Sequence, residues 1–169
     1  HALSGRDVAL VADSGAPSGN KRVLVYNPPV VNRELGMRAS SVKTAVSLAS
    51  DLLEAGVSTL VFGQSRNQVE VMLKYLRDRV KDASIDDTAI QAYRGGYLPN
   101  TRRRIENGLR EGTVRCVVAT NALELGIDIG ALDAVVTVGF PGTMAALWQQ
   151  FGRGGRRRGS PPRARTLGG

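Results

Sequence analysis

Short apolar runs rich in β-branched residues recur along the chain and predict strands. Each run is bounded by Gly, Pro or polar residues, as the strands of a buried sheet are. The first run ends at Pro28 and Pro29, which cannot continue a hydrogen-bonded ladder. The predicted strands are "KRVLVYN" at 21–27, "STLVFG" at 58–63, "TAIQAY" at 88–93, "VRCVVAT" at 114–120 and "ALDAVVTVGF" at 131–140.

Between these runs, apolar residues recur every three or four positions, which is typical of amphipathic helices. Ser40 or Ser41 is a candidate N-cap for the first helix, and Gly56 is its predicted end. Pro99 near its start and Gly112 at its end bound the third helix. A polar loop is expected between the first strand and the first helix. The predicted helices cover residues 40–56, 65–82, 99–112 and 143–151.

Strands and helices thus alternate with short connections, which is the pattern of an α/β fold with a mainly parallel sheet between layers of helices. The strands at 114–120 and 131–140 are apolar through their centres, as strands covered on both faces should be. Ligands of such folds collect at the carboxyl ends of the strands. The loops with the best chance of carrying function are therefore 63–66, 93–97, 120–128 and 140–156.

Composition indicates one globular domain. Of 169 residues, 42% are hydrophobic and 22% charged, and no apolar run approaches the roughly 18 residues that a membrane span needs. The lone cysteine, Cys116, excludes an intrachain disulfide and a cysteine-based metal cluster, and it favours a reducing cytoplasm. The chain begins at His1 without a secretory pattern, so we expect a piece of a longer protein. Residues 1–19 are expected to be a connecting segment, and residues 159–169 a flexible tail.

The net charge of +8 is concentrated in the second half of the chain. Residues 1–93 carry 11 basic and 10 acidic side chains, whereas residues 94–169 carry 12 and 5. Arginine supplies 19 of the 23 basic residues, which suits bidentate contacts with phosphate, although a GC-rich genome gives the same bias. This excess favours a polyanionic partner such as nucleic acid or a nucleotide. A solvated basic surface is the alternative.

Two loops that follow strands carry residues suited to phosphate. Ser65 and Arg66 stand where a helix is predicted to begin, so amides and a guanidinium meet there, although Ser65 is equally suited to be only an N-cap. Arg94 is followed by two glycines that let the backbone approach a ligand, although a plain turn is the simpler interpretation. The three arginines at 102–104 point in different directions on their helix and are expected to form mainly a solvated face.

The stretch "ATNALELGIDIG" is a more specific signal. A strand that reads as buried is followed by the polar pair Thr120 and Asn121 and then by Gly126 and Asp128. This order is unusual for a segment with only a structural role. The structural alternative is that Thr120 caps a helix and Asp128 a turn.

The stretch "WQQFGRGGRRRG" at 148–159 carries closely spaced glycines and arginines. Arg153 and Arg156 are three residues apart and so project to one side of a helical or tight turn. The glycines between and beside them let the backbone approach a ligand. Taken alone, the stretch also fits a solvated basic face.

The four stretches "LVFGQSR", "YRGGYLP", "VVATNALELGIDIG" and "LWQQFGRGGR", in this order and spacing, resemble the second RecA-like domain of superfamily 2 DExH/D-box helicases. The resemblance covers roughly residues 20–158 and implies a RecA-like three-layer α/β/α fold. "NPPVVNRELGMR" and "FPGTMAALWQQFGRGGR" look like the branch of the Hrq- and Mrf-type DNA-repair helicases, with Lhr-type helicases as neighbours.

The resemblance implies two groups of site residues. Ser65 and Arg66 look like motif four, Arg94 and Gly95 like motif four-a, and Thr120, with Asn121 beside it, like the motif five threonine that contacts a backbone phosphate. These six residues are expected on the nucleic-acid track. The residues expected to face ATP are Gly126 and Asp128 of motif five and Gln149, Arg153 and Arg156 of motif six.

The same resemblance implies the chemistry. Arg153 and Arg156 are expected to be arginine fingers, which stabilise the charge that develops on the γ-phosphate during hydrolysis. ATP with Mg²⁺ is the implied cofactor, and single-stranded or tailed duplex nucleic acid, DNA rather than RNA, the implied partner, with 3′ to 5′ movement. Arg157 and Arg158 are expected to be solvated or to face the DNA.

Two departures from the family pattern stand out. Gln149 is followed by Gln150 where many members have Gln-Arg, and "GSPPRARTLGG" follows motif six in place of an apolar strand. The sequence also lacks a phosphate loop and a DExH/D magnesium box. We therefore expect that it does not hydrolyse ATP alone and that an N-terminal RecA-like domain of the same parent chain supplies those parts. The alternatives are an idle nucleic-acid-binding module and a nucleotide-binding domain unrelated to nucleic acid.

Overall fold

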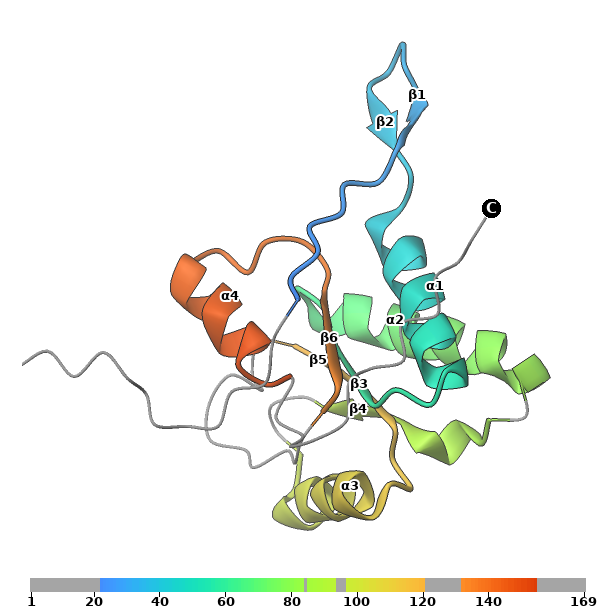
Figure 1. Cartoon of the computed structure of the whole chain (residues 1–169), viewed down its shortest axis with the longest axis vertical. Coiled ribbons are helices and arrows are strands. Elements are labelled where there is room, and N and C mark those ends of the chain that lie inside the picture. The colour runs from blue at the N-terminus through green and yellow to red at the C-terminus, as the bar shows by residue number, and fades with distance from the viewer. Residues whose placement is uncertain (1–21, 84, 94–96, 121–131, 155–169) are drawn as a thin grey trace, which may run out of the picture.

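A four-stranded parallel sheet forms the centre of the computed structural model, which describes residues 22–83, 85–93, 97–120 and 132–154 (Figure 1). The strand order is β4-β5-β3-β6. All three neighbouring pairs are parallel and start level with one another: Thr59 lies opposite Cys116 and Ala134, and Ile90 lies opposite Cys116. The carboxyl ends of all four strands therefore lie at one edge. The strands are β3 (Thr59–Phe62), β4 (Ile90–Tyr93), β5 (Cys116–Ala119) and β6 (Ala134–Thr137).

Helices cover both faces of this sheet. The first two helices pack on each other and on one face, where alternate strand residues such as Val61 and Val118 complete the core. Ile105 of the third helix closes the opposite face with Leu60 and Phe62, and the fourth helix packs on β6. The predicted three-layer α/β/α fold is confirmed (Figure 1). The helices are α1 (Ser41–Glu54), α2 (Arg66–Val80), α3 (Pro99–Glu111) and α4 (Met144–Phe151), with short 3₁₀ turns η1 (Lys81–Ala83) and η2 (Asp87–Ala89).

The helix ends follow the local chemistry of the sequence. The Ser40 hydroxyl accepts a hydrogen bond from the Lys43 amide at 3.3 Å and caps α1, so Ser40 and not Ser41 is the N-cap. Pro99 is the first residue of α3, where its missing N–H costs nothing. Gly112 ends the same helix in the left-handed conformation, at φ 79°.

The last two strands differ in burial, which corrects one prediction. All four residues of β5 are buried, as its apolar sequence predicts. All four residues of β6 are only half-buried. Both β4 and β6 are edge strands among the described strands, yet β4 is mostly buried. The difference lies in the helices that cover them: β4 packs on α2, whereas β6 packs on α1 and on α4, of whose residues only Gln150 is buried. An apolar run does not reveal how well neighbouring elements cover a strand.

The N-terminal segment also differs from its prediction. Residues 22–29 form no helix or strand, and Leu24 and Val25 are 92% and 96% exposed. β-branched side chains favour an extended backbone, but a strand also needs a hydrogen-bonding neighbour, and this segment has none within the described chain. The polar loop expected next is instead an antiparallel hairpin of β1 (Val30–Asn32) and β2 (Met37–Arg38), which projects from the body (Figure 1).

Candidate functional site

The carboxyl edge of the sheet brings together loops from separate parts of the sequence. The Gly63 amide donates to the Ala119 carbonyl at 2.8 Å, and the Val138 amide donates to the Phe62 carbonyl at 3.0 Å. The residues that follow β5, β3 and β6 therefore lie side by side. Thr120, directly after β5, is half-buried at this edge.

The start of α2 lies at the same edge. Ser65 is the N-cap, and its hydroxyl oxygen accepts from the Gln68 amide at 3.2 Å. Ser65 and Arg66 are both exposed, and the positive end of the helix dipole adds to the arginine charge there. The cap uses only the oxygen, so the Ser65 O–H still has a proton to donate. Capping and phosphate binding are thus compatible roles for one side chain.

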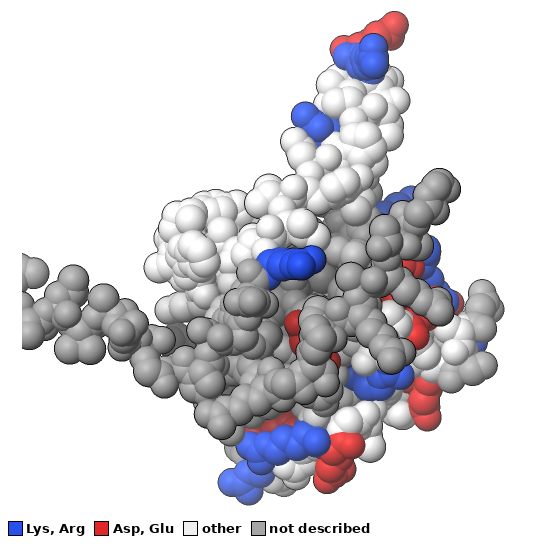
Figure 2. Space-filling model, viewed as in Figure 1, with Lys and Arg blue, Asp and Glu red and all other residues white. Residues whose placement is uncertain are grey.

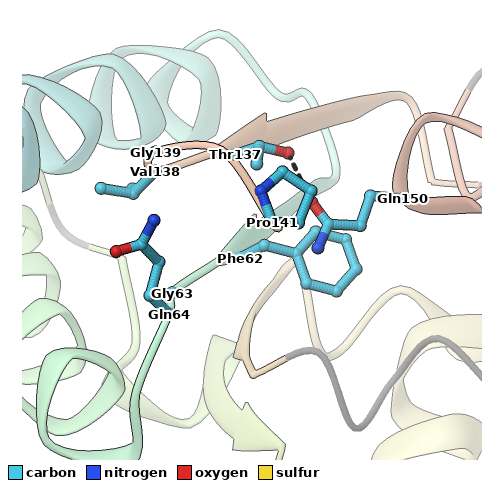
Figure 3. Close-up of a pocket in the computed structure, with 8 residues that line it drawn as sticks. All are labelled: Phe62, Gly63, Gln64, Thr137, Val138, Gly139, Pro141 and Gln150. Carbon is cyan, nitrogen blue, oxygen red and sulfur yellow. Dashed lines mark hydrogen bonds between the residues drawn. The ribbon is translucent and has the colours of Figure 1, made fainter. Parts of the chain in front are cut away.

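Beside Ser65, a cluster of side chains joins the loop after β3 to the loop between β6 and α4 (Figure 3). The Gln64 side-chain amide donates to the Phe140 carbonyl at 3.2 Å, and the Gln64 backbone amide donates to the Gln68 side-chain oxygen at 2.6 Å. Gly139 has φ 76°, and a Cβ there would strike the Gln64 amide. Side chains fill the space, so the cluster is a contact between loops and not a ligand cavity. It is lined by Phe62, Gly63, Gln64, Thr137, Val138, Gly139, Pro141 and Gln150.

Gln150 is a buried member of this cluster that the sequence analysis did not assign to the site. It is 1% exposed, and its side-chain oxygen accepts a hydrogen bond of 3.1 Å from the Thr137 hydroxyl. Gln149, the neighbour predicted to face ATP, is exposed on α4. Helical spacing contained the signal, because Gln150 falls on the same inward stripe as Ala146 and Leu147.

Arg153 lies at the other end of β6. Gly154 pairs with Leu132 in a parallel bridge, and Leu132 precedes β6, whereas Gln150 contacts Thr137 at the carboxyl end. Thr137 is five positions after Leu132, or roughly 16 Å along an extended chain. Arg153, the half-buried residue before Gly154, thus has its backbone near the amino end of β6, whereas Ser65 and Thr120 lie at the carboxyl edge of the sheet.

The glycine after Arg153 is explained by packing. Gly154 is buried, and a Cβ there would lie 2.9 Å from a methyl carbon of Val135. From the sequence alone, the glycines of this stretch are predicted to let the backbone approach a ligand. For Gly154, close contact with β6 accounts for the residue type. Six predicted site residues lie outside the described residues, namely Arg94, Gly95, Asn121, Gly126, Asp128 and Arg156.

Burial raises the pKa of two titratable side chains in the sheet. It raises the pKa of the Cys116 thiol to about 12, so this buried cysteine is a neutral apolar side chain and not a nucleophile. Burial also raises the pKa of Tyr93, at the carboxyl end of β4, and its ring meets Tyr97 edge to face at 6.2 Å. Within the described ranges, no cluster of His, Cys, Asp and Glu can hold a metal ion, and no helix is long and apolar enough to cross a membrane.

The surface charge differs between α3 and α4. Arg103 and Arg104 on α3 are exposed and Arg102 is half-buried, which agrees with three consecutive arginines that point in different directions. The stretch 134–152, which includes α4, has no charged residue. The surface over α4 is accordingly uncharged in Figure 2, whereas basic and acidic side chains lie near each other over α3.

Comparison with known proteins places this geometry in a family context. The family model described as the helicase conserved C-terminal domain matches residues 43–158. The ATP-dependent helicase YprA of Bacillus subtilis, described as uncharacterized, is 50% identical over 93% of this chain and 21% of its own. The ATP-dependent helicase hrq1 of Schizosaccharomyces pombe is 42% identical over 91% of this chain and 15% of its own. The chain thus spans about a fifth or less of the length of these relatives.

A solved structure agrees with the sequence matches. The crystal structure of the DUF1998 helicase MrfA bound to DNA and AMPPNP superposes with a TM-score of 0.82 and 50% identity. It covers 93% of this chain and 22% of that chain. Helicases named Lhr also match, at lower identity.

Proposed function

Because the chain belongs to the helicase conserved C-terminal domain family, we propose that it is the second motor domain of an ATP-dependent DNA helicase or translocase of the repair type, moving 3′ to 5′. The relative MrfA, whose structure was solved with DNA and AMPPNP, matches 93% of the chain at 50% identity, which supports both ligands. The chain itself has no phosphate loop and no DExH/D box, so hydrolysis requires a second domain.

The observation that carries this proposal is that the backbone next to Arg153 lies near the amino end of β6, away from the polar residues at the carboxyl edge of the sheet. Ser65, Arg66 and Thr120 lie at the carboxyl edge of the sheet, and we assign them to the track that holds strand phosphates. Arg153 lies beyond the amino end of β6, and we assign it to ATP. A domain with two separate phosphate-binding surfaces suits a motor that links hydrolysis to movement along a strand. We extend the first set to Arg94, Gly95 and Asn121 and the second to Gly126, Asp128, Gln149 and Arg156.

Arginine suits the second surface for a chemical reason. Attack of water on ATP develops charge on the γ-phosphate oxygens, and a guanidinium that reaches them only when the domains close stabilises the transition state more than the ground state. In GTPases such a finger contributes roughly 10³ to 10⁵ in rate. Arg153 and Arg156 have this role in our proposal, and the Mg²⁺ ligands come from the other domain.

The exposed side of α4 suits contact with that second domain. Phe140, Met144 and Trp148 are each more than half exposed, and the stretch 134–152 that contains them has no charged residue. Exposed apolar patches of this kind mark protein interfaces. An N-terminal RecA-like domain of the same parent chain is the proposed partner, because it would supply the missing phosphate loop.

The test uses the full-length protein that contains this chain. We expect Arg153→Ala and Arg156→Ala each to lower DNA-stimulated ATP turnover at least a hundredfold while the affinity for single-stranded DNA changes less than threefold. Arg79→Ala, an exposed arginine on α2, is the matched control and should leave both quantities unchanged. If wild type binds DNA but turns over no ATP, the idle binding module is correct. If turnover survives in both variants, the finger assignment is wrong.

The nucleic-acid track has its own test. Thr120→Val removes a hydroxyl at nearly constant volume and should weaken single-stranded DNA binding about tenfold, since one hydrogen bond to a charged group contributes roughly 1.5 kcal/mol. Binding by the wild type should also fall steeply with salt, as phosphate contacts release counterions. DNA binding that is weak and insensitive to salt would instead favour a nucleotide-binding domain unrelated to nucleic acid.

A further inference from the structure

The helix that precedes Arg153 is held to the sheet by little apolar contact. Of the eight residues of α4, only Gln150 is buried, and the others are half-buried or exposed. Within the described elements, α4 packs chiefly on β6. A short helix with one buried side chain depends strongly on what that side chain contacts. Here the side chain is polar, so its hydrogen bond adds to the attachment that the half-buried Ala146, Leu147 and Phe151 provide.

That hydrogen bond joins the helix to the sheet at a defined point. The Thr137 hydroxyl, on the last residue of β6, donates to the Gln150 side-chain oxygen at 3.1 Å. Figure 3 shows the two side chains facing each other beside Phe62 and Pro141. Inside a protein, a polar group that loses its partner pays a large desolvation penalty. The pairing therefore favours one rotation and one height of α4 relative to β6 over all others.

The rotation and height of α4 also determine the positions of the residues proposed to bind ATP. Gln149 precedes Gln150 and points outward, so burying one side chain exposes the other. The Arg153 amide donates to the Gln150 carbonyl at 3.0 Å. Both residues are thus placed by the backbone of Gln150. Glutamine can be buried at this position without burying a charge.

We propose that Gln150 is a positioning residue, which through its hydrogen bond to Thr137 orients α4 so that Gln149 and Arg153 reach ATP. This inference rests on the proposed function of Arg153. It goes further in assigning a role to a residue that itself does not touch the nucleotide. The hydrogen bond holds Gln149 and Arg153 in the positions that the transition state requires. A catalytic group misplaced by about 1 Å costs roughly a hundredfold in rate.

The variants Thr137→Val and Thr137→Ser separate this role from general stability. Thr137→Val keeps the shape and removes the donor, and Thr137→Ser keeps the donor. In the full-length protein we expect Thr137→Val to lower kcat of DNA-stimulated ATP hydrolysis at least tenfold, with KM for ATP and DNA affinity within twofold of wild type. Thr137→Ser should stay within twofold in all three. Equal kcat values for the two variants would overturn the proposal.

A second substitution covers the case in which Thr137→Val unfolds at the assay temperature. Gln150→Met keeps the length of the side chain, lacks the amide, and leaves the half-buried Thr137 hydroxyl able to bond water. It should show the same loss of kcat at constant KM, and a kcat within twofold of wild type overturns the proposal. If Arg153→Ala retains turnover, the assignment of Arg153 to ATP, on which this inference rests, fails. If Arg153→Ala abolishes turnover while both other variants keep it, only the positioning role fails.

Discussion

Replacing Gly154 by alanine tests whether this glycine serves the fold or a ligand. The sequence alone suggests that glycines beside Arg153 make room for a bound molecule. In the structure the residue is buried against β6, and a new Cβ would lie 2.9 Å from the Val135 Cγ2 atom. The two interpretations predict different results, because one affects only binding and the other affects folding.

The expected loss of stability follows from this contact. A separation of 2.9 Å is below the ordinary contact distance of about 3.5 to 4.0 Å between carbon atoms. Val135 cannot rotate away cheaply, since a β-branched side chain has few rotamers. Overpacking costs about 1–3 kcal/mol, and the lower chain entropy of unfolded alanine returns about 0.4–1 kcal/mol. We expect a net loss of about 1–2 kcal/mol in the free energy of unfolding.

Urea denaturation of the chain, followed by circular dichroism, measures this loss. For a protein of this size, about 1–2 kcal/mol corresponds to a fall of roughly 3–6 °C in Tm. Gly152→Ala is the control, because Gly152 has helical φ of −63° and an added Cβ would meet only the carbonyl oxygens of Trp148 and Gln149, at 3.3 Å, and no β-branched side chain; its effect should be smaller than that of Gly154→Ala. A Gly154→Ala variant as stable as wild type would refute the packing argument and restore the ligand interpretation.

Three further outcomes are expected. Ser65→Ala should lower the free energy of unfolding by about 1 kcal/mol through loss of the α2 cap, and Ser65→Thr should retain most of it, as measured by urea denaturation. Gly139→Ala should cost about 1–2 kcal/mol in the same assay, because alanine is strained at φ 76°, and should also break the Gln64 contact. The thiol of Cys116 has a pKa of about 12 when folded and near 9.0 when unfolded, so above pH 9 the unfolded chain binds fewer protons. The free energy of unfolding should therefore fall as pH rises from 9, by at most about 1.4 kcal/mol per pH unit. Cys116→Ala, measured over the same pH range, should lack this part of the pH dependence.

Much of the fold could be predicted from periodicity and end signals. The predicted strands at 58–63, 88–93 and 114–120 contain β3, β4 and β5, and the helix ends at Ser40 and Gly112 follow from capping chemistry. These features depend on residues close in sequence, so a single sequence contains them. The RecA-like fold and its family were predicted from four motifs in a fixed order, and both are confirmed.

The errors arose where distant residues decide the structure. The run at 21–27 has strand composition, yet residues 22–29 form no strand and are mostly exposed, because no neighbouring strand pairs with them among the described residues. The half-burial of β6 depends on the helices that cover it, since β4 is also an edge strand and is mostly buried. Gln150 was noticed only as a departure from the family pattern, since its contact with Thr137 joins two elements that no local pattern connects.

The position of α4 gives the two proposed surfaces a physical connection. The loop that leads into α4 is tied to Gln64, the residue before Ser65, through the Phe140 carbonyl, and the same helix continues to Arg153. A shift of the loop after β3 that breaks this bond would also act on α4, because Gln150 fixes the helix on β6 at the same cluster. Strand binding at Ser65 and ATP contact at Arg153 would then share one mobile element, as coupling between two sites requires. On this argument, Gln64→Ala should leave DNA affinity within twofold but reduce the stimulation of ATP turnover by DNA. Equal stimulation in variant and wild type would mean that coupling does not pass through this cluster.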